Sequence, residues 1–143
     1  MIAVDTNILV YAHRKDSAWH ETAYTRLAEV AEGRAAWAIP WTCLHEFLAI
    51  VTHPRIYDPP TPLETALRQV EAWLEAPGVV LLAETESYWH ELRVTLTGGR
   101  VAGPQVHDAR IAALCRLHGI EDLWTADRDF GRFPGLKTVN PLL

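Results

Sequence analysis

Acidic residues of this 143-residue sequence stand where predicted strands end and predicted helices begin. Asp5 directly follows an apolar run at residues 1–4, and Asp127 comes shortly after the strand predicted at 123–125. In open parallel sheets, ligands bind beyond the carboxyl ends of the strands, at the point where the strand order reverses. If these two strands are neighbours, their ends lie about 4.8 Å apart, and both carboxylates can share one metal ion.

Asp108 lies in the first turn of a helix predicted at 105–118 and heads its apolar stripe. Ile111, Ala112 and Cys115 follow it at spacings of three, four and seven residues, which places them on one helix face. No lysine or arginine shares that stripe, and burying an ionised carboxylate without a partner costs free energy. A bound cation would offset this cost, so the position favours a cation site. The other interpretation is that Asp108 complements the helix dipole.

Glu46 and Asp129 are weaker candidates by spacing alone. Glu46 belongs to a helix predicted at 43–52, where its neighbours form a mixed face typical of a solvated acid. Asp129 follows Asp127 by two residues and can simply cap the next turn, as any single aspartate at a strand end can. The joint occurrence of these acids at one edge of the sheet favours a shared metal site.

Such a cluster suits Mg²⁺ or Mn²⁺, which prefer oxygen ligands and need no histidine. An ion of this kind generates hydroxide near neutral pH and stabilises charge on a phosphoryl oxygen. The histidines form no HxxxH or HxH pair, which argues against zinc. No Walker, GxGxxG or GxSxG motif is present, which excludes the common nucleotide-binding and hydrolase patterns.

Composition indicates an ordinary globular protein with one domain at 1–143. The net charge of −5 argues against a protein that coats nucleic acid non-specifically. It does not exclude a nuclease, because a metal ion bound among acids reverses the sign of the local charge. Two cysteines without a CxxC pattern, no charged leader and no membrane-length apolar run predict a cytoplasmic protein that contacts no membrane.

Apolar runs of strand length alternate with helix-period segments, which predicts an α/β domain with a mostly parallel sheet. Ser17 is the predicted N-cap of a helix that ends at Gly33, and Thr42 is the predicted cap of the next helix. Residues 54–62 contain four prolines and are predicted to be a loop. Strands are expected at 1–4, 37–39, 79–82, 123–125 and 136–139.

Four segments carry a family resemblance. Residues 1–12, MIAVDTNILVYA, resemble the opening of PIN-domain proteins, specifically VapC-like toxins. Residues 41–47 resemble their second motif, which ends in an acid followed by Phe, and residues 107–109 resemble the third, in which an aspartate starts a helix. Residues 124–130, followed by 133–136, resemble the fourth motif and the tail. The match covers the whole chain, and the order and spacing of the four motifs make it specific.

The resemblance implies a three-layer α/β/α sandwich with a central, mostly parallel sheet of about five strands. It implies that a catalytic cluster binds Mg²⁺ or Mn²⁺ through Asp5, Glu46, Asp108 and Asp127. Supporting positions that orient the ligands are Asp129, Thr6, Asn7 and Thr125. Candidates for holding the RNA backbone, on chain position alone, are Arg14, Lys15, Arg128 and Arg132.

By the same resemblance, the chain is expected to be an endoribonuclease toxin that inhibits translation and growth until a cognate antitoxin neutralises it. A homodimer is expected, alone or within a larger toxin–antitoxin assembly. A PIN nuclease of RNA processing or DNA repair stays open as the alternative. A receiver-type signalling domain would need a lysine near the last strand, where Lys137 is the only candidate. A non-enzymatic module with a decayed site is disfavoured because all four acids are present.

Overall fold

Five strands form one parallel sheet in this computed structural model, which describes residues 1–143. All four pairs of neighbouring strands are parallel, which confirms the α/β class predicted from the sequence. The strands are β1 (Ile2–Val4), β2 (Trp37–Pro40), β3 (Val79–Leu82), β4 (Asp122–Trp124) and β5 (Lys137–Val139). Across the sheet they follow the order β3-β2-β1-β4-β5.

The strand order reverses between β1 and β4. From β1 the chain proceeds outward through β2 to β3, whereas β4 and β5 lie on the other side of β1. Ala3 is in register with Leu123, and Val4 with Trp124, so both strands end level with each other. The carboxyl ends of β1 and β4 are therefore the switch point at which α/β proteins bind ligands.

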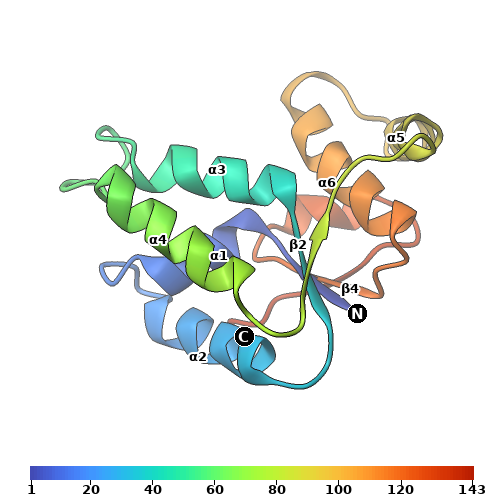
Figure 1. The fold of residues 1–143 in the computed structure, drawn as a ribbon. Coiled ribbons are helices and arrows are strands. Elements are labelled where there is room, and N and C mark those ends of the chain that lie inside the picture. Colours follow the sequence, from blue (N-terminus) through green and yellow to red (C-terminus); the bar gives the residue numbers. More distant parts are fainter.

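Helices cover both faces of this sheet, giving three layers. Figure 1 shows α1 to α4 gathered on one side and α5 and α6 on the other. None of the helices combines the length and the apolar character that crossing a bilayer requires. The α-helices are α1 (Thr6–His13), α2 (His20–Glu32), α3 (Trp41–Val51), α4 (Leu63–Leu74), α5 (Tyr88–Gly98) and α6 (Val106–Leu117), and the 3₁₀ helices are η1 (Gly103–Gln105) and η2 (Arg128–Arg132).

The central strands are buried on both faces of the sheet and lead directly into the polar edge. Ala3 and Val4 point to opposite faces of β1, and both are fully buried, as only a sheet covered on both sides permits. Ile39 in β2 and Leu123 in β4 are equally inaccessible. The next residue after Val4 is Asp5, which caps α1 by accepting a 2.7 Å hydrogen bond from the Thr6 backbone N–H.

Two predicted helix caps are wrong. α2 begins at His20, because the Ser17 hydroxyl accepts the Trp19 N–H at 3.1 Å in a local turn that precedes the helix. α3 begins directly after Pro40, whose extended backbone conformation provides the N-cap, so Thr42 lies inside the first turn. The Thr42 hydroxyl is buried there without a hydrogen-bond partner.

Candidate metal centre

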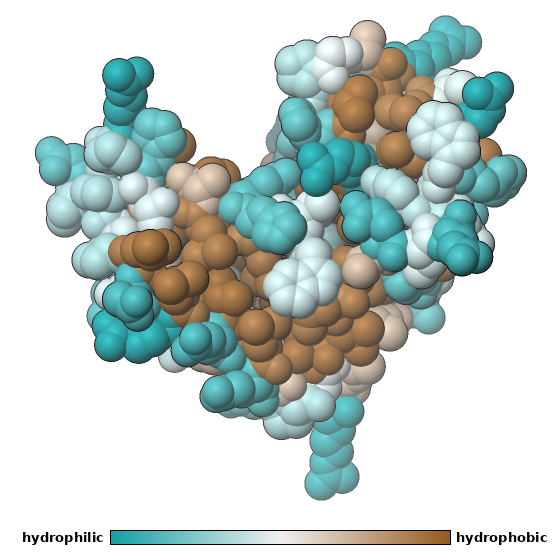
Figure 2. Space-filling view, turned by 45° about the horizontal axis from the view of Figure 1, so that its top comes forward, coloured by the Kyte–Doolittle hydropathy of each residue, from teal (hydrophilic) through white to brown (hydrophobic).

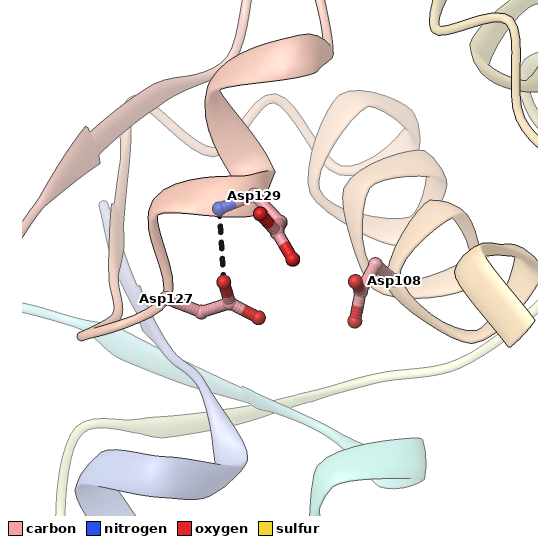
Figure 3. A group of neighbouring side chains, drawn as sticks. All are labelled: Asp108, Asp127 and Asp129. Carbon is pink, nitrogen blue, oxygen red and sulfur yellow. Dashed lines mark hydrogen bonds between the residues drawn. The ribbon is translucent and has the colours of Figure 1, made fainter.

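Three carboxylates converge at the carboxyl edge of the sheet. One carboxylate oxygen from each of Asp108, Asp127 and Asp129 lies within 4.8 Å of the other two. Asp108 comes from the first turn of α6, and Asp127 is the N-cap of η2. The Asp127 carboxylate accepts the Asp129 backbone N–H at 2.9 Å, and Figure 3 shows the two side chains facing Asp108 across a shared space.

No basic side chain pairs with these three acids. The four ion pairs of the chain use other carboxylates, those of Asp16, Glu91, Glu121 and Asp122. Burial raises the pKa of Asp108, the charges of Asp127, Asp129 and Glu46 raise it further, and the charge of Arg132 lowers it. The cluster is therefore self-repelling, and a bound cation would relieve that repulsion.

The donor set fits a hard divalent ion. It contains only carboxylate oxygens, which Mg²⁺ and Mn²⁺ prefer, and none of the nitrogen or sulfur ligands typical of zinc. Mg²⁺ holds oxygen ligands at about 2.1 Å, so oxygens on opposite sides of the ion are about 4.2 Å apart. Oxygens on neighbouring sides of the ion are about 3 Å apart. The three oxygens, now within 4.8 Å of one another, would therefore draw closer together to bind one ion.

Asp5 stands outside this group of three, and its carboxylate is occupied by donors of its own chain. Oδ1 accepts the Thr6 N–H at 2.7 Å and the Cys43 thiol at 3.7 Å. Oδ2 accepts the Thr125 hydroxyl at 2.7 Å and the Asn7 side-chain amide at 3.3 Å. The side chain is 4% exposed, so these contacts replace nearly all of its hydration.

Thr125 connects Asp5 to the segment that carries Asp127. Its hydroxyl donates to Asp5 and accepts the Asp127 N–H at 3.0 Å and the Asn7 amide at 3.2 Å. The Asn7 carbonyl oxygen in turn accepts the Ala126 N–H at 3.2 Å. These bonds tie the first turn of α1 to the chain leaving β4, and so they hold the backbone of Ala126 and Asp127 in place.

Glu46 approaches the same edge from α3. Its Oε2 accepts the Thr6 hydroxyl at 2.7 Å, while Oε1 makes no hydrogen bond within the chain. The charge of Glu46 raises the pKa of both Asp5 and Asp108, as expected for a carboxylate that faces both. Like Asp5, it lies outside the group formed by the three aspartates.

Burial is the main reason that the pKa of Asp5 rises from 3.8 to about 6. The charges of Glu46 and Asp108 add to this effect, and the hydrogen bonds from Thr125 and Thr6 offset only part of it. Asp5 is consequently mostly ionised at neutral pH, and burying its charge away from water lowers the stability of the fold.

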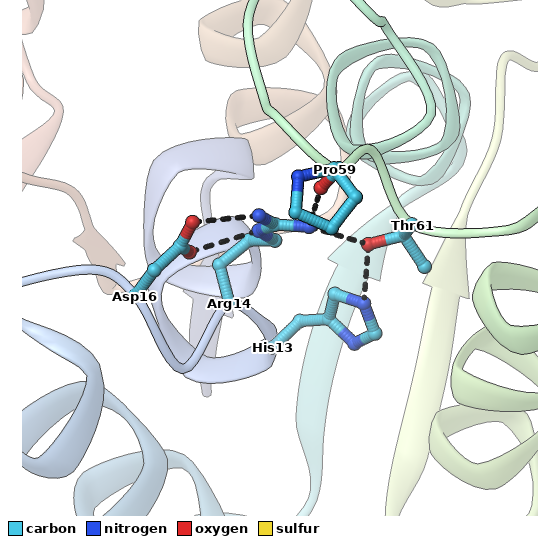
Figure 4. A network of polar contacts seen from close by, with 5 residues as sticks. All are labelled: His13, Arg14, Asp16, Pro59 and Thr61. Carbon is cyan, nitrogen blue, oxygen red and sulfur yellow. Dashed lines mark hydrogen bonds and ion pairs between the residues drawn. The ribbon is translucent and has the colours of Figure 1, made fainter.

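Arg14, predicted from the sequence to hold the RNA backbone, makes several hydrogen bonds within its own chain. Its Nε and Nη2 donate to Asp16 at 2.9 and 2.6 Å, and its Nη1 donates to the Pro59 carbonyl at 3.0 Å and to the Thr61 hydroxyl at 3.2 Å (Figure 4). The guanidinium also lies 4.2 Å from the ring centroid of Tyr57. Arg14 thus ties the end of α1 to the proline-rich loop between α3 and α4.

The other predicted basic residues differ in their placement. Arg128 and Arg132 are exposed at the two ends of η2, the short helix that also carries Asp129. Arg132 is close enough for its charge to lower the pKa of Asp108. Lys15 is exposed beyond the end of α1, next to the Arg14 tether. Arg128 and Arg132 are therefore the predicted cations that share an element with the acidic cluster.

Lys137 does not support a receiver-type domain. It begins β5 and pairs at 3.1 Å with Asp122, which begins β4. Both residues lie at the amino edge of the parallel sheet, opposite the edge where the aspartates gather. The signalling alternative is therefore wrong.

The chain belongs to the PIN-domain family, since the family model described as PIN domain matches residues 2–136. Ribonuclease VapC48 of Mycobacterium tuberculosis is 31% identical over 137 residues, which cover 96% of this chain and 94% of the relative. Ribonuclease VapC43 of the same organism is 33% identical over 142 residues, covering 99% of this chain and 96% of the relative.

Solved structures agree with this fold. VapBC2 from Rickettsia felis, bound to a DNA fragment from its promoter, aligns with a TM-score of 0.67 at 25% identity and covers 98% of both chains. VapC20 from M. tuberculosis, described as a sarcin-ricin loop cleaving toxin, aligns with a TM-score of 0.69 over 92% of this chain and 93% of its own. At 18% identity, the second likeness shows the fold alone.

The raised pKa of Asp5 predicts a pH-dependent stability. An acid with a higher pKa in the folded state binds its proton more tightly there, so the metal-free protein should lose stability as the pH rises from about 4 to about 6. Asp5→Asn removes this ionisation, so its stability relative to wild type should rise over that range by on the order of 3 kcal/mol. Urea unfolding in EDTA at several pH values measures the difference, and parallel curves would contradict the assignment.

The Arg14 tether predicts a stability defect. Arg14→Ala removes hydrogen bonds to a carboxylate, a carbonyl and a hydroxyl, and should lower the free energy of unfolding by about 1–3 kcal/mol. Arg14→Lys should recover little, since an ammonium group cannot reproduce the planar fork. The matched control is Arg34→Ala, at an exposed arginine with no side-chain hydrogen bond. Chemical denaturation tests this, and equal stability of all variants would refute the tether.

Proposed function

We propose that this chain is a divalent-metal-dependent endoribonuclease and the toxin of a toxin–antitoxin pair, which inhibits translation and growth until its antitoxin neutralises it. The observation that carries the proposal is the unpaired cluster of Asp108, Asp127 and Asp129 at the switch point of a PIN-domain sheet. The names of the similar relatives, ribonucleases VapC48 and VapC43, support RNA as the substrate.

In this proposal, Asp108, Asp127 and Asp129 hold Mg²⁺ or Mn²⁺. When bound, such an ion lowers the pKa of water and stabilises charge developing on a phosphoryl oxygen. Asp5 acts through Thr125, because the shared hydroxyl fixes the Asp127 backbone and thereby the aim of its carboxylate. Asn7 braces the same link from α1.

Glu46 is the proposed acceptor for the proton of the attacking water. Its Oε2 is held by the Thr6 hydroxyl, which orients the side chain, and its Oε1 is left without a partner. A carboxylate held at one oxygen and free at the other can take a proton without losing its position. In this proposal Asp108 and Asp127 are metal ligands, as predicted from the sequence, and Asp129, predicted as a supporting residue, is the third ligand. Asp5 and Glu46, which were also predicted as ligands, are given other roles.

The RNA backbone would meet the exposed Arg128 and Arg132 of η2, beside the acidic cluster. Figure 2 shows a hollow between the part of the molecule that carries α3 and α4 and the part that carries α5 and α6. In this proposal a single strand lies in this hollow, with one phosphodiester at the acids. Lys15, at the far end of α1, is a more distant backbone contact.

An apolar groove between α2 and α4 supports an antitoxin partner. It has a volume of about 240 Å³, and most of its lining is apolar, including Leu27 and Ala31 of α2 and Trp73 of α4. An amphipathic segment of an antitoxin can bury its apolar face there. The VapBC2 structure, a complex of this toxin class, is consistent with such a partner.

A homodimer, alone or within a larger toxin–antitoxin assembly, and a cytoplasmic location complete the proposal. β3 is an edge strand whose Val80 is 38% exposed, and Figure 2 shows apolar side chains gathered in this region of the surface. A second copy could cover them. The alternative role in RNA processing or DNA repair has less support, because the similar relatives carry VapC names.

Removing a ligand should abolish cleavage. Asp108→Asn, Asp127→Asn and Asp129→Asn should each lower the rate by at least about a hundredfold, since each removes one third of the charge that holds the ion. The matched control is Glu71→Gln, an exposed acid on α4, which should cut normally. The assay incubates purified protein with total RNA in Mg²⁺, Mn²⁺ or EDTA and maps the cut ends.

Cleavage that persists in EDTA, or an Asp127→Asn variant that cuts RNA like the wild type, would overturn the metal assignment. No cleavage by the wild type in either ion would overturn the ribonuclease proposal as a whole.

A further inference from the structure

Two aromatic side chains project from the N-terminal end of α3. The Trp41 side chain is 38% exposed although it begins a helix that packs into the core, and His45 is exposed one turn later. Their ring centroids are 6.4 Å apart and their planes are inclined by 33°. The pair forms a small aromatic surface, which we call the Trp41–His45 platform.

The platform lies at the same edge of the sheet as the acidic residues. Trp41 follows Pro40 at the carboxyl end of β2, the same edge at which β1 leads into Asp5 and β4 leads toward Asp127. On α3, Trp41 and His45 form one stripe, and Thr42 and Glu46 form the next, about 100° around the helix. Glu46 reaches the α1 side through its hydrogen bond to Thr6, so the platform flanks the proposed proton acceptor.

The overall charge of this protein does not favour binding to RNA. The chain has a net charge of −5, and its site gathers carboxylates that repel phosphate until an ion is bound. Stacking of a nucleobase on an aromatic ring does not depend on phosphate attraction, and it typically strengthens binding roughly 5- to 150-fold per base. An exposed indole at the same edge of the sheet as the acids can supply this kind of contact.

We propose that Trp41, supported by His45, stacks on an unpaired nucleobase of the RNA next to the phosphodiester that is cut. This inference rests on the proposed ribonuclease function and adds a substrate-binding residue to it. A base inside a duplex has no free face, so the platform selects single-stranded or loop RNA over paired RNA. An exposed tryptophan is also suited to a protein contact, and the test separates the two.

The test measures the affinity of a short, fluorescein-labelled, mixed-sequence single-stranded RNA by anisotropy, in an Asp127→Asn background that leaves the probe uncut. Trp41→Ala should weaken binding roughly 5- to 150-fold, Trp41→Leu should behave like Trp41→Ala, and Trp41→Phe should retain most of the affinity. The leucine variant separates stacking from simple apolar contact. Binding of the same sequence as a duplex should not respond to any of these substitutions.

The matched control is Trp19→Ala. Trp19 is 46% exposed but precedes α2, at the end of α1 opposite Asp5, so its removal should leave RNA affinity unchanged. Circular dichroism verifies that each variant folds. Quenching of tryptophan fluorescence by the probe should also disappear in Trp41→Phe and persist in Trp19→Ala, a signature that a structural role for Trp41 would not produce.

A parent protein that does not bind the probe, or a Trp41→Ala affinity within about twofold of the parent, overturns the stacking proposal. So does a Trp41→Ala variant that changes the oligomeric state in sedimentation but not the RNA affinity, since Trp41 would then be a protein contact. In either case, a wild type that still cuts total RNA in Mg²⁺ or Mn²⁺ leaves the proposed function standing.

Discussion

Repulsion among carboxylates that no basic side chain neutralises is the constraint on which the rest of this structure depends. Asp108, Asp127 and Asp129 share one small space, and burial together with neighbouring negative charge raises the pKa of Asp108. The fold holds them there through stronger local forces: the cap of α1, the cap of η2 and the burial of β1 and β4 on both faces. A cation bound among them would relieve this repulsion, which is the electrostatic basis of the proposed metal site.

In the proposed site, Asp108, Asp127 and Asp129 face the ion, and Asp5 positions the segment that carries Asp127. Asp5 accepts four hydrogen bonds and is almost completely buried, which suits a residue that joins two strand ends rather than one that keeps an oxygen free. Because Thr125 bonds both Asp5 and the Asp127 backbone, a change at Asp5 should be felt as a change in the aim of Asp127. Glu46 completes the edge from α3 with one oxygen held and one free.

The sequence predicted the sheet and its acidic edge because both follow from local pattern. Apolar runs end at Asp5 and near Asp127, and parallel strands bring such ends together, whereas the place of Glu46 came only from the family resemblance. The arrangement of Asp129 was not predictable, since two aspartates in one turn can point apart unless a cap aligns them. The role of Arg14 depends on the Pro59 carbonyl, 45 residues away, which periodicity cannot reveal.

Anomalous scattering from a crystal grown with Mn²⁺ tests the central claim most directly, because it locates the ion without relying on activity. The account predicts a peak bounded by carboxylate oxygens of Asp108, Asp127 and Asp129, with the Asp5 carboxylate still bonded to Thr125. A peak held by Asp5 and Glu46 without Asp129, or no peak at this edge of the sheet, would contradict it.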